Sequence, residues 1–169
     1  MSASASRTGL PLAVERAATL WAMAGGALLL LVVAINVASV IGGLFGKPFA
    51  GDFELTEVGT AVAVFAFLPF VQITDANVSA DIFTQRAPVR LVAAFGLLAA
   101  LVAMAFALLL GWRMYLGMLD QKSYDYTTAI VQFPHWIAFL PILASIALLA
   151  LCAAVTAAER LARIAAPGH

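Results

Sequence analysis

The sequence predicts an all-α integral membrane protein with four transmembrane helices. Hydrophobic residues make up 64% of the 169 residues and charged residues only 11%, and the mean hydropathy is +1.03. Soluble domains carry about 25% charged residues, so this chain lacks the polar surface that a soluble fold needs. Because about 20 apolar residues span the hydrocarbon core of a bilayer, the apolar runs predict one four-helix domain, residues 1–169, with spans at about 18–41, 55–73, 91–115 and 130–157.

The first apolar run follows Arg7 and Arg16, as the apolar core of a signal peptide would follow its basic residues. Its stretch 21–41 is longer than the roughly 7–15 residues of such a core. The glycine-rich segment that follows contains no convincing A-x-A cleavage site. We therefore interpret this run as an uncleaved first span.

The third run is long enough to exceed the membrane. Residues 89–118 would measure about 45 Å as a continuous helix, so we expect this helix to tilt or to project from the bilayer. Trp112 and Tyr115 are expected at its non-cytoplasmic end, since such aromatic residues favour the interface. Arg113 lies between them, and we expect it either to anchor the helix at the headgroups or to contact a partner.

The distribution of arginine predicts the orientation of the spans. Six arginines fall on one side of an alternating four-span topology: Arg7, Arg16, Arg86, Arg90, Arg160 and Arg163. The connections on the other side hold only Lys47 and Lys122 as basic residues. Because cytoplasmic loops accumulate Lys and Arg, we expect both termini in the cytoplasm (N-in, C-in).

The connection between spans two and three is the most polar segment of the chain. The spacing of Asp75, Asn77 and Ser79 is similar to the start of an EF-hand loop. Ala80 then stands at the glycine position of that loop and Arg86 at the position of its terminal glutamate, which argues against a calcium site.

A short interfacial helix explains this connection better. Asn77 or Ser79 can cap such a helix, Asp81 lies near its positive N-terminus, and Pro88 ends it. We expect a structural latch on the cytoplasmic side that involves Asp75, Asn77, Asp81, Arg86 and Pro88.

The spans carry too few polar residues for catalysis, and Asn36 and Ser145 are the deepest of them. A proton-coupled exporter needs a carboxylate at mid-depth. A thiol oxidoreductase needs a cysteine pair, but Cys152 is alone. A haem protein needs facing histidines, but His135 lies near an interface and His169 at the C-terminus. We expect no enzymatic activity, no metal and no cofactor.

Several motifs follow one another in an order typical of one transporter family. These are an acidic start to the second span, a polar loop with a hydrophobic pair, a basic residue and a proline, and a proline–aromatic step at the fourth span: Glu54 and Glu57; Asn77, Val78, Asp81, Ile82, Phe83, Arg86 and Pro88; Phe133, Pro134, His135 and Trp136. With this pattern the chain resembles the small membrane subunit, of DctQ type, of tripartite ATP-independent periplasmic (TRAP) transporters. Many such subunits carry an arginine and an aromatic residue just after span one, where this chain has residues 41–46, so no role of that arginine is carried over.

The resemblance implies a complex in the bacterial inner membrane with a large multi-helix subunit and a periplasmic substrate-binding protein. In that family the large subunit imports an organic acid, driven by a sodium gradient, and the small subunit is similar to a non-catalytic scaffold. The alternative hypothesis is a self-sufficient small transporter or channel that acts as a homo-oligomer. The missing charges at mid-membrane favour the scaffold, and we expect no nucleic-acid partner.

The non-cytoplasmic connections carry the charged residues that we expect to help dock the binding protein. These candidate contacts are Lys47, Asp52, Asp120, Lys122 and Asp125. Each of them is also an ordinary solvated charge of an exposed loop. Glu54 and Glu57 mark the start of span two.

Overall fold

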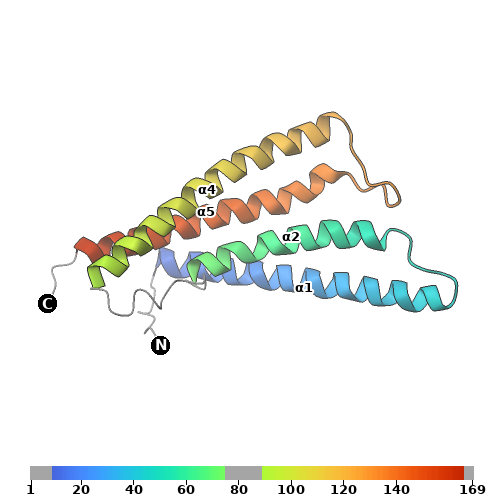
Figure 1. The fold of residues 1–169 in the computed structure, drawn as a ribbon, viewed down its shortest axis with the longest axis horizontal. Helices are drawn as coiled ribbons and strands as arrows, with labels where there is room; N and C mark the ends of the chain where they lie inside the picture. Colours follow the sequence, from blue (N-terminus) through green and yellow to red (C-terminus); the bar gives the residue numbers. More distant parts are fainter. Residues whose placement is uncertain (1–8, 75–88, 166–169) are drawn as a thin grey trace.

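The computed structural model describes residues 9–74 and 89–165. These ranges form four helices, α1 (Leu10–Leu44), α2 (Asp52–Ile73), α4 (Val89–Ser123) and α5 (His135–Ala165) (Figure 1). All four are long and apolar enough to cross a membrane, which confirms the predicted all-helical, four-span fold. The short interfacial helix predicted between spans two and three lies outside the described residues.

Seen as in Figure 1, the helices follow one another in a row in the order α1, α2, α5, α4, and α1 also contacts α5. Within the most apolar window of each helix, 33% of the residues are buried in α2 and in α5, but only 11% in α1 and in α4. The central helices α2 and α5 therefore carry the core, and α1 and α4 are the edges of the row. Most of the surface of both edge helices is left for lipid or for another protein.

The seam between α1 and α2 is built from small residues at heptad spacing. The residues of α1 buried along it are Ala18, Ala22, Gly25, Val32 and Ser39, and those of α2 include Gly59, Ala63 and Ala66. This alternating spacing of three and four keeps one face of each helix toward its neighbour. Small side chains let the two backbones approach closely, so the antiparallel hairpin is held by van der Waals contact along its length.

The second hairpin, α4 and α5, joins the first one through α5. The core cluster here consists of Ala107, Ile142, Ile146 and Leu149, and Val62, Phe65 and Leu68 of α2 pack against it together with Leu110 and Met114 of α4. Because α2 and α5 belong to different hairpins, they run parallel to each other in the middle of the row (Figure 1). This cluster is where the two hairpins meet.

The helices begin and end at different residues from the predicted spans. The first helix extends beyond 18–41 at both ends, α4 continues to Ser123, and α5 begins only at His135. Residues 130–134 belong instead to the preceding loop, where Thr127 and Pro134 form an isolated β-bridge. A residue that precedes proline avoids the helical region, which explains why the helix starts after Pro134 although the apolar run starts earlier.

The two connections 45–51 and 124–134 lie at one end of the row, which we call the loop end. Helix α1 begins and α5 finishes at the opposite end (Figure 1). This arrangement agrees with a four-pass chain whose termini share one side of the membrane.

We expect that side to be the cytoplasm, because the arginines gather there. A reporter that is active only in the cytoplasm, fused at the C-terminus, should be active, and a periplasm-only reporter at the same site should be silent. The opposite pair of activities would show that the orientation is inverted.

Candidate functional site

The carboxylate of Glu54 connects the first turn of α2 to the loop that precedes α5. Its Oε1 accepts a hydrogen bond from the backbone N–H of Ile130 at 2.8 Å, and its Oε2 accepts one from the N–H of Val131 at 2.9 Å. A charged acceptor makes stronger hydrogen bonds than a neutral one. The two oxygens thus hold two successive amides that no helix or sheet would satisfy.

Backbone contacts beside Glu54 bring the two loops together. Gly51 has φ of +90°, and a Cβ added there would lie 2.3 Å from Cγ2 of Val131. This position therefore needs glycine both for its backbone conformation and for the close approach of the second loop. The loop 45–51, the start of α2 and the loop 124–134 form one ordered surface at the loop end.

The loop 124–134 is also closed on itself. The N–H of Thr128 donates to the carbonyl of Phe133 at 3.0 Å, and the N–H of Phe133 donates back to Oγ1 of Thr128 at 3.0 Å. The N–H of His135 donates to the carbonyl of Tyr126 at 3.0 Å. Tyr124 and Tyr126 remain exposed at the tip, so the loop presents aromatic side chains from a fixed backbone.

Polar side chains within the α1–α2 seam satisfy one another. Nδ2 of Asn36 donates to Oγ1 of Thr56 at 2.6 Å and to the carbonyl of Val32 at 2.9 Å. Closer to the loop end, the hydroxyl of Ser39 donates to the carboxylate of Asp52. The deepest polar residue of span one therefore pairs with its neighbouring helix.

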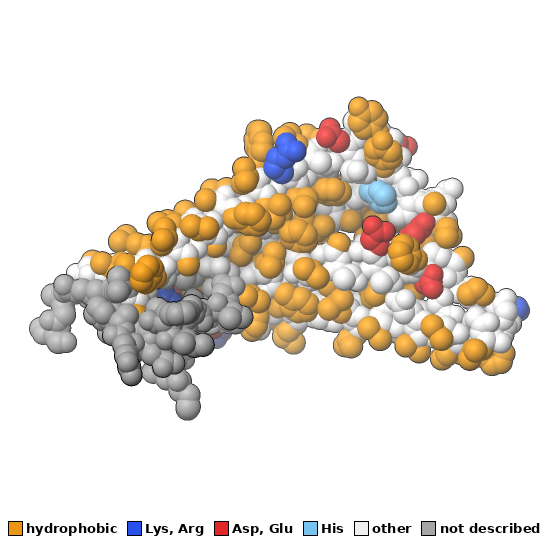
Figure 2. All heavy atoms as spheres, viewed as in Figure 1, with side chains coloured by type: hydrophobic (Ala, Val, Ile, Leu, Met, Phe, Trp, Pro, Cys, Tyr) orange, Lys and Arg blue, Asp and Glu red, His pale blue; other side chains and the backbone are white. Residues whose placement is uncertain are grey.

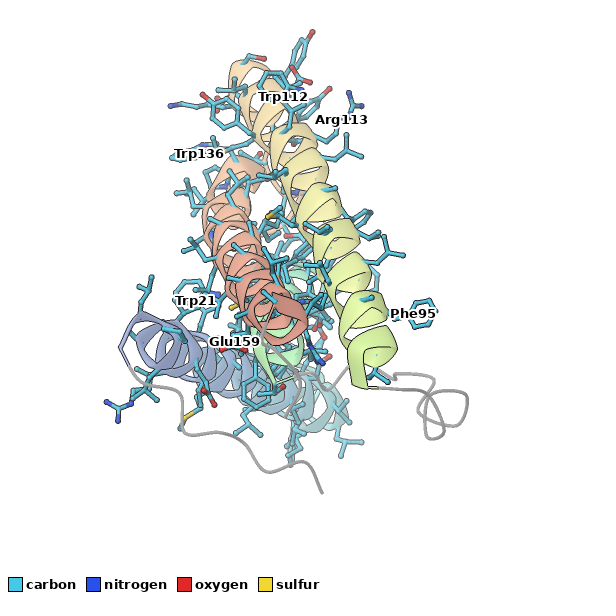
Figure 3. All side chains as sticks on the ribbon, turned by 90° about the vertical axis from the view of Figure 1, so that its left-hand side faces the viewer. Trp21, Phe95, Trp112, Arg113, Trp136 and Glu159 are labelled. Atoms are coloured by element: carbon cyan, nitrogen blue, oxygen red, sulfur yellow. The ribbon has the colours of Figure 1, made fainter. Side chains whose placement is uncertain are left out.

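The remaining deep polar residue, Ser145, connects the edge helix α1 to α5. Nε1 of Trp21 donates to Oγ of Ser145 at 2.8 Å, and that hydroxyl donates to the carbonyl of Pro141 at 2.8 Å. Figure 3 shows Trp21 reaching from α1 to the side of α5. Ser145 is buried, so this hydrogen bond joins α1 to α5 inside the bundle.

Between this pair and the loop end, an apolar groove of about 280 Å³ lies where α1 and α5 leave one side of α2 uncovered. Its walls include Leu28, Leu31, Val58, Val62, Ile137 and Ala138. Glu54 and Thr128 stand at its edge nearest the loops, where Glu54 already accepts two backbone hydrogen bonds. The lining of this groove, apart from Glu54 and Thr128, suits hydrocarbon or apolar side chains.

The structure places the predicted docking charges at the loop end but brings few of them together. Figure 2 shows acidic side chains gathered there, while apolar side chains cover the length of the helices. Lys47, Asp120 and Asp125 are exposed. Nζ of Lys122 lies 5.1 Å from the ring centroid of Trp136, a cation–π contact that joins the ends of α4 and α5.

Of the two acidic residues at the start of span two, only Glu54 contacts the loop, whereas Glu57 is exposed. The predicted cytoplasmic latch lies outside the described residues, as do all of its members: Asp75, Asn77, Asp81, Arg86 and Pro88. Within ranges 9–74 and 89–165, no group of three His, Cys, Asp or Glu side chains could hold a metal ion.

Sequence reasoning missed the partners of these polar residues, although one signal was present. Ala18, Ala22, Gly25, Val32, Asn36 and Ser39 share one heptad stripe in the sequence. Small and polar residues on one stripe of an apolar helix indicate a helix–helix contact. The acceptor role of Glu54 toward a loop more than seventy residues away leaves no such pattern.

A model of the family described as "Tripartite ATP-independent periplasmic transporters, DctQ component" matches residues 29–163. The chain belongs to the DctQ family. The match covers most of the chain, from the second half of α1 nearly to the end of α5, which confirms the resemblance drawn from the sequence motifs. No curated protein and no solved structure matches the chain.

As a DctQ protein, the chain is the small membrane component of a TRAP transporter and crosses the membrane several times. The site at its loop end lies within the matched residues.

Proposed function

We propose that this chain is the non-catalytic scaffold subunit of a sodium-coupled TRAP transporter in the bacterial inner membrane. The transporter imports an organic acid that a periplasmic binding protein delivers. A large multi-helix subunit carries the acid and the sodium ions, and this chain enlarges the fixed part against which that subunit moves. The loop end docks the binding protein.

One observation carries the proposal: Asn36 and Ser145, the deep uncharged polar residues of the spans, are hydrogen-bonded inside the bundle. Asn36 pairs with Thr56, and Trp21 pairs with Ser145. A path for an anion and its coupling ions needs charged or polar groups that face a water-filled cavity. The groove described above is apolar instead, so it supports packing and not conduction.

The row of helices adds independent support. A row offers a wide apolar flank, and its two edge helices keep most of their surface exposed. A self-sufficient transporter needs an enclosed polar path, whereas the groove between α1, α2 and α5 is lined mainly by apolar side chains. A scaffold that extends the membrane footprint of a larger subunit needs such a flank.

Reconstitution tests the proposal directly. The purified chain in liposomes, with an inward sodium gradient and the binding protein outside, should take up no organic acid above empty liposomes. Liposomes that also contain the large subunit should show sodium-dependent uptake. Uptake by the chain alone would refute the scaffold role and support the alternative of a small homo-oligomeric transporter.

A further inference from the structure

Two charged residues of the spans, Arg113 and Glu57, have no hydrogen-bond or ion-pair partner within the described part of the chain. Arg113 of α4 is exposed, and it makes no hydrogen bond or ion pair with residues 9–74 or 89–165. The polar residues Asn36 and Ser145 both have partners. Glu57 lies in the second turn of α2, next to the loop end, whereas Arg113 lies further along its span.

Arg113 does not lie at the end of its helix. Leu110 and Met114, on either side of it, pack against the core cluster that also receives Val62 and Phe65 from the middle of α2. Helix α2 has 22 residues and measures about 33 Å, close to the thickness of the hydrocarbon core. Helix α4 continues for roughly 15 Å beyond Arg113, to Ser123. The backbone of Arg113 is thus level with the middle of the bundle.

The side chain points away from the bundle. Figure 3 shows Arg113 and Phe95 on the same side of α4, facing away from α5. Between them, residues at alternating spacings of three and four form a stripe that we call the α4 outer stripe: Phe95, Ala99, Val102, Phe106, Leu109 and Arg113, all of them exposed. The α4 outer stripe is thus an exposed apolar surface that ends in one charged residue, Arg113.

A guanidinium at this depth needs an anion. Charged residues in membrane spans almost always face protein or a water-filled cavity and pair with another group. Arginine presents a planar fork that binds a carboxylate through two parallel hydrogen bonds. A single polar position in an apolar helix seam also fixes the register of the two helices. An arginine that binds a carboxylate in this way, and so fixes the register of two helices, requires a partner helix that carries Asp or Glu.

We propose that the α4 outer stripe is the surface that docks onto the large membrane subunit, and that Arg113 pairs there with a carboxylate of that subunit. The inference rests on the proposed scaffold function and specifies its interface. Charge complementarity selects this edge of the row, because the exposed side chains of the opposite edge, α1, are apolar over its membrane-spanning part.

Recovery of the complex tests the pairing. The tagged small subunit is co-expressed with the large subunit, and the large subunit recovered per small subunit is measured after solubilisation. Arg113→Leu should lower this ratio about tenfold, as expected for the loss of a buried charge pair. Arg113→Lys should recover only part of the ratio, because lysine lacks the planar fork. Lys47→Leu, which removes an exposed loop charge, is the matched control and should leave the ratio unchanged.

Site-specific photo-crosslinking locates the surface. A benzophenone amino acid at Leu109 should give an adduct with the large subunit. The same probe at Leu30 of α1, where the side chain is 73% exposed, should give none.

Three results would overturn the proposal. Normal recovery of the complex with Arg113→Leu would show that Arg113 only anchors the helix to lipid headgroups. An adduct at Leu30 but not at Leu109 would place the large subunit on the other edge and leave the scaffold function intact. An adduct between two copies of this chain would point to a homo-oligomer. Uptake by the chain alone, measured separately, is the result that refutes the scaffold function itself.

Discussion

Gly25→Leu is expected to force α1 and α2 apart and to give a large loss of stability. A Cβ at this position would lie 2.8 Å from the Cβ of Ala66 and 3.3 Å from the backbone oxygen of Ala63. Neither atom belongs to a flexible side chain, so the helices themselves must move. Overpacking of this kind costs about 1–3 kcal/mol or more, and we expect the midpoint of thermal unfolding in detergent to fall by roughly 5–10 °C.

The neighbouring glycine provides a matched control. A Cβ at Gly26 would come no closer than 4.0 Å to the ring of Phe67. Gly26→Ala should therefore leave the midpoint unchanged or raise it slightly, since alanine favours a helix more than glycine does. Gly25→Ala should lower it by less than Gly25→Leu. Equal effects of alanine at both positions would show that the seam is looser than the structure describes.

Glu54→Ala is expected to release the loop 124–134 from the start of α2. The variant removes both oxygens that accept hydrogen bonds from the N–H groups of Ile130 and Val131. These amides would then form hydrogen bonds with water. Hydrogen exchange at these two amides in the assembled complex should become roughly tenfold faster or more, because their exchange no longer requires release of the carboxylate. If this loop docks the binding protein, transport at limiting binding-protein concentration should also fall.

Glu57→Ala is the control for this experiment. It removes a carboxylate one turn further along α2 that is exposed to solvent. Exchange at Ile130 and Val131 should stay at the level of the unsubstituted protein. Unchanged exchange in Glu54→Ala as well would mean that the loop keeps its position without the carboxylate.

The four helices could be predicted because each depends on a long apolar run. Runs of this length specify a membrane span whatever surrounds them, and the row contains one helix for each run. Helix ends were less predictable. The apolar run of the fourth span begins near residue 130, but Pro134 delays the helix to His135, and the bridge between Thr127 and Pro134 fixes the intervening residues.

The candidate site could be predicted only in part. The acidic start of the second span marked Glu54 as notable, but its partners are backbone amides, which every residue except proline possesses. The side chains of Ile130 and Val131 give no indication of that contact, because only their backbone N–H groups take part in it. Arg113 was expected at the end of its span because it lies between Trp112 and Tyr115. The continuation of α4 to Ser123, which places it beside the core cluster, depends on packing against α5.

The parallel pairing of α2 and α5 has a consequence for biogenesis. Each hairpin consists of neighbours in the chain, so it can form as soon as its second helix leaves the ribosome. The central pair has to wait, because Glu54 is bound by amides 76 and 77 residues downstream. During that interval α2 lies in the bilayer with its inner face and its carboxylate uncovered. Contacts of such long sequence separation form late, and partly assembled chains are where misassembly begins. We therefore expect misassembly of this chain to begin while only α1 and α2 have been synthesised.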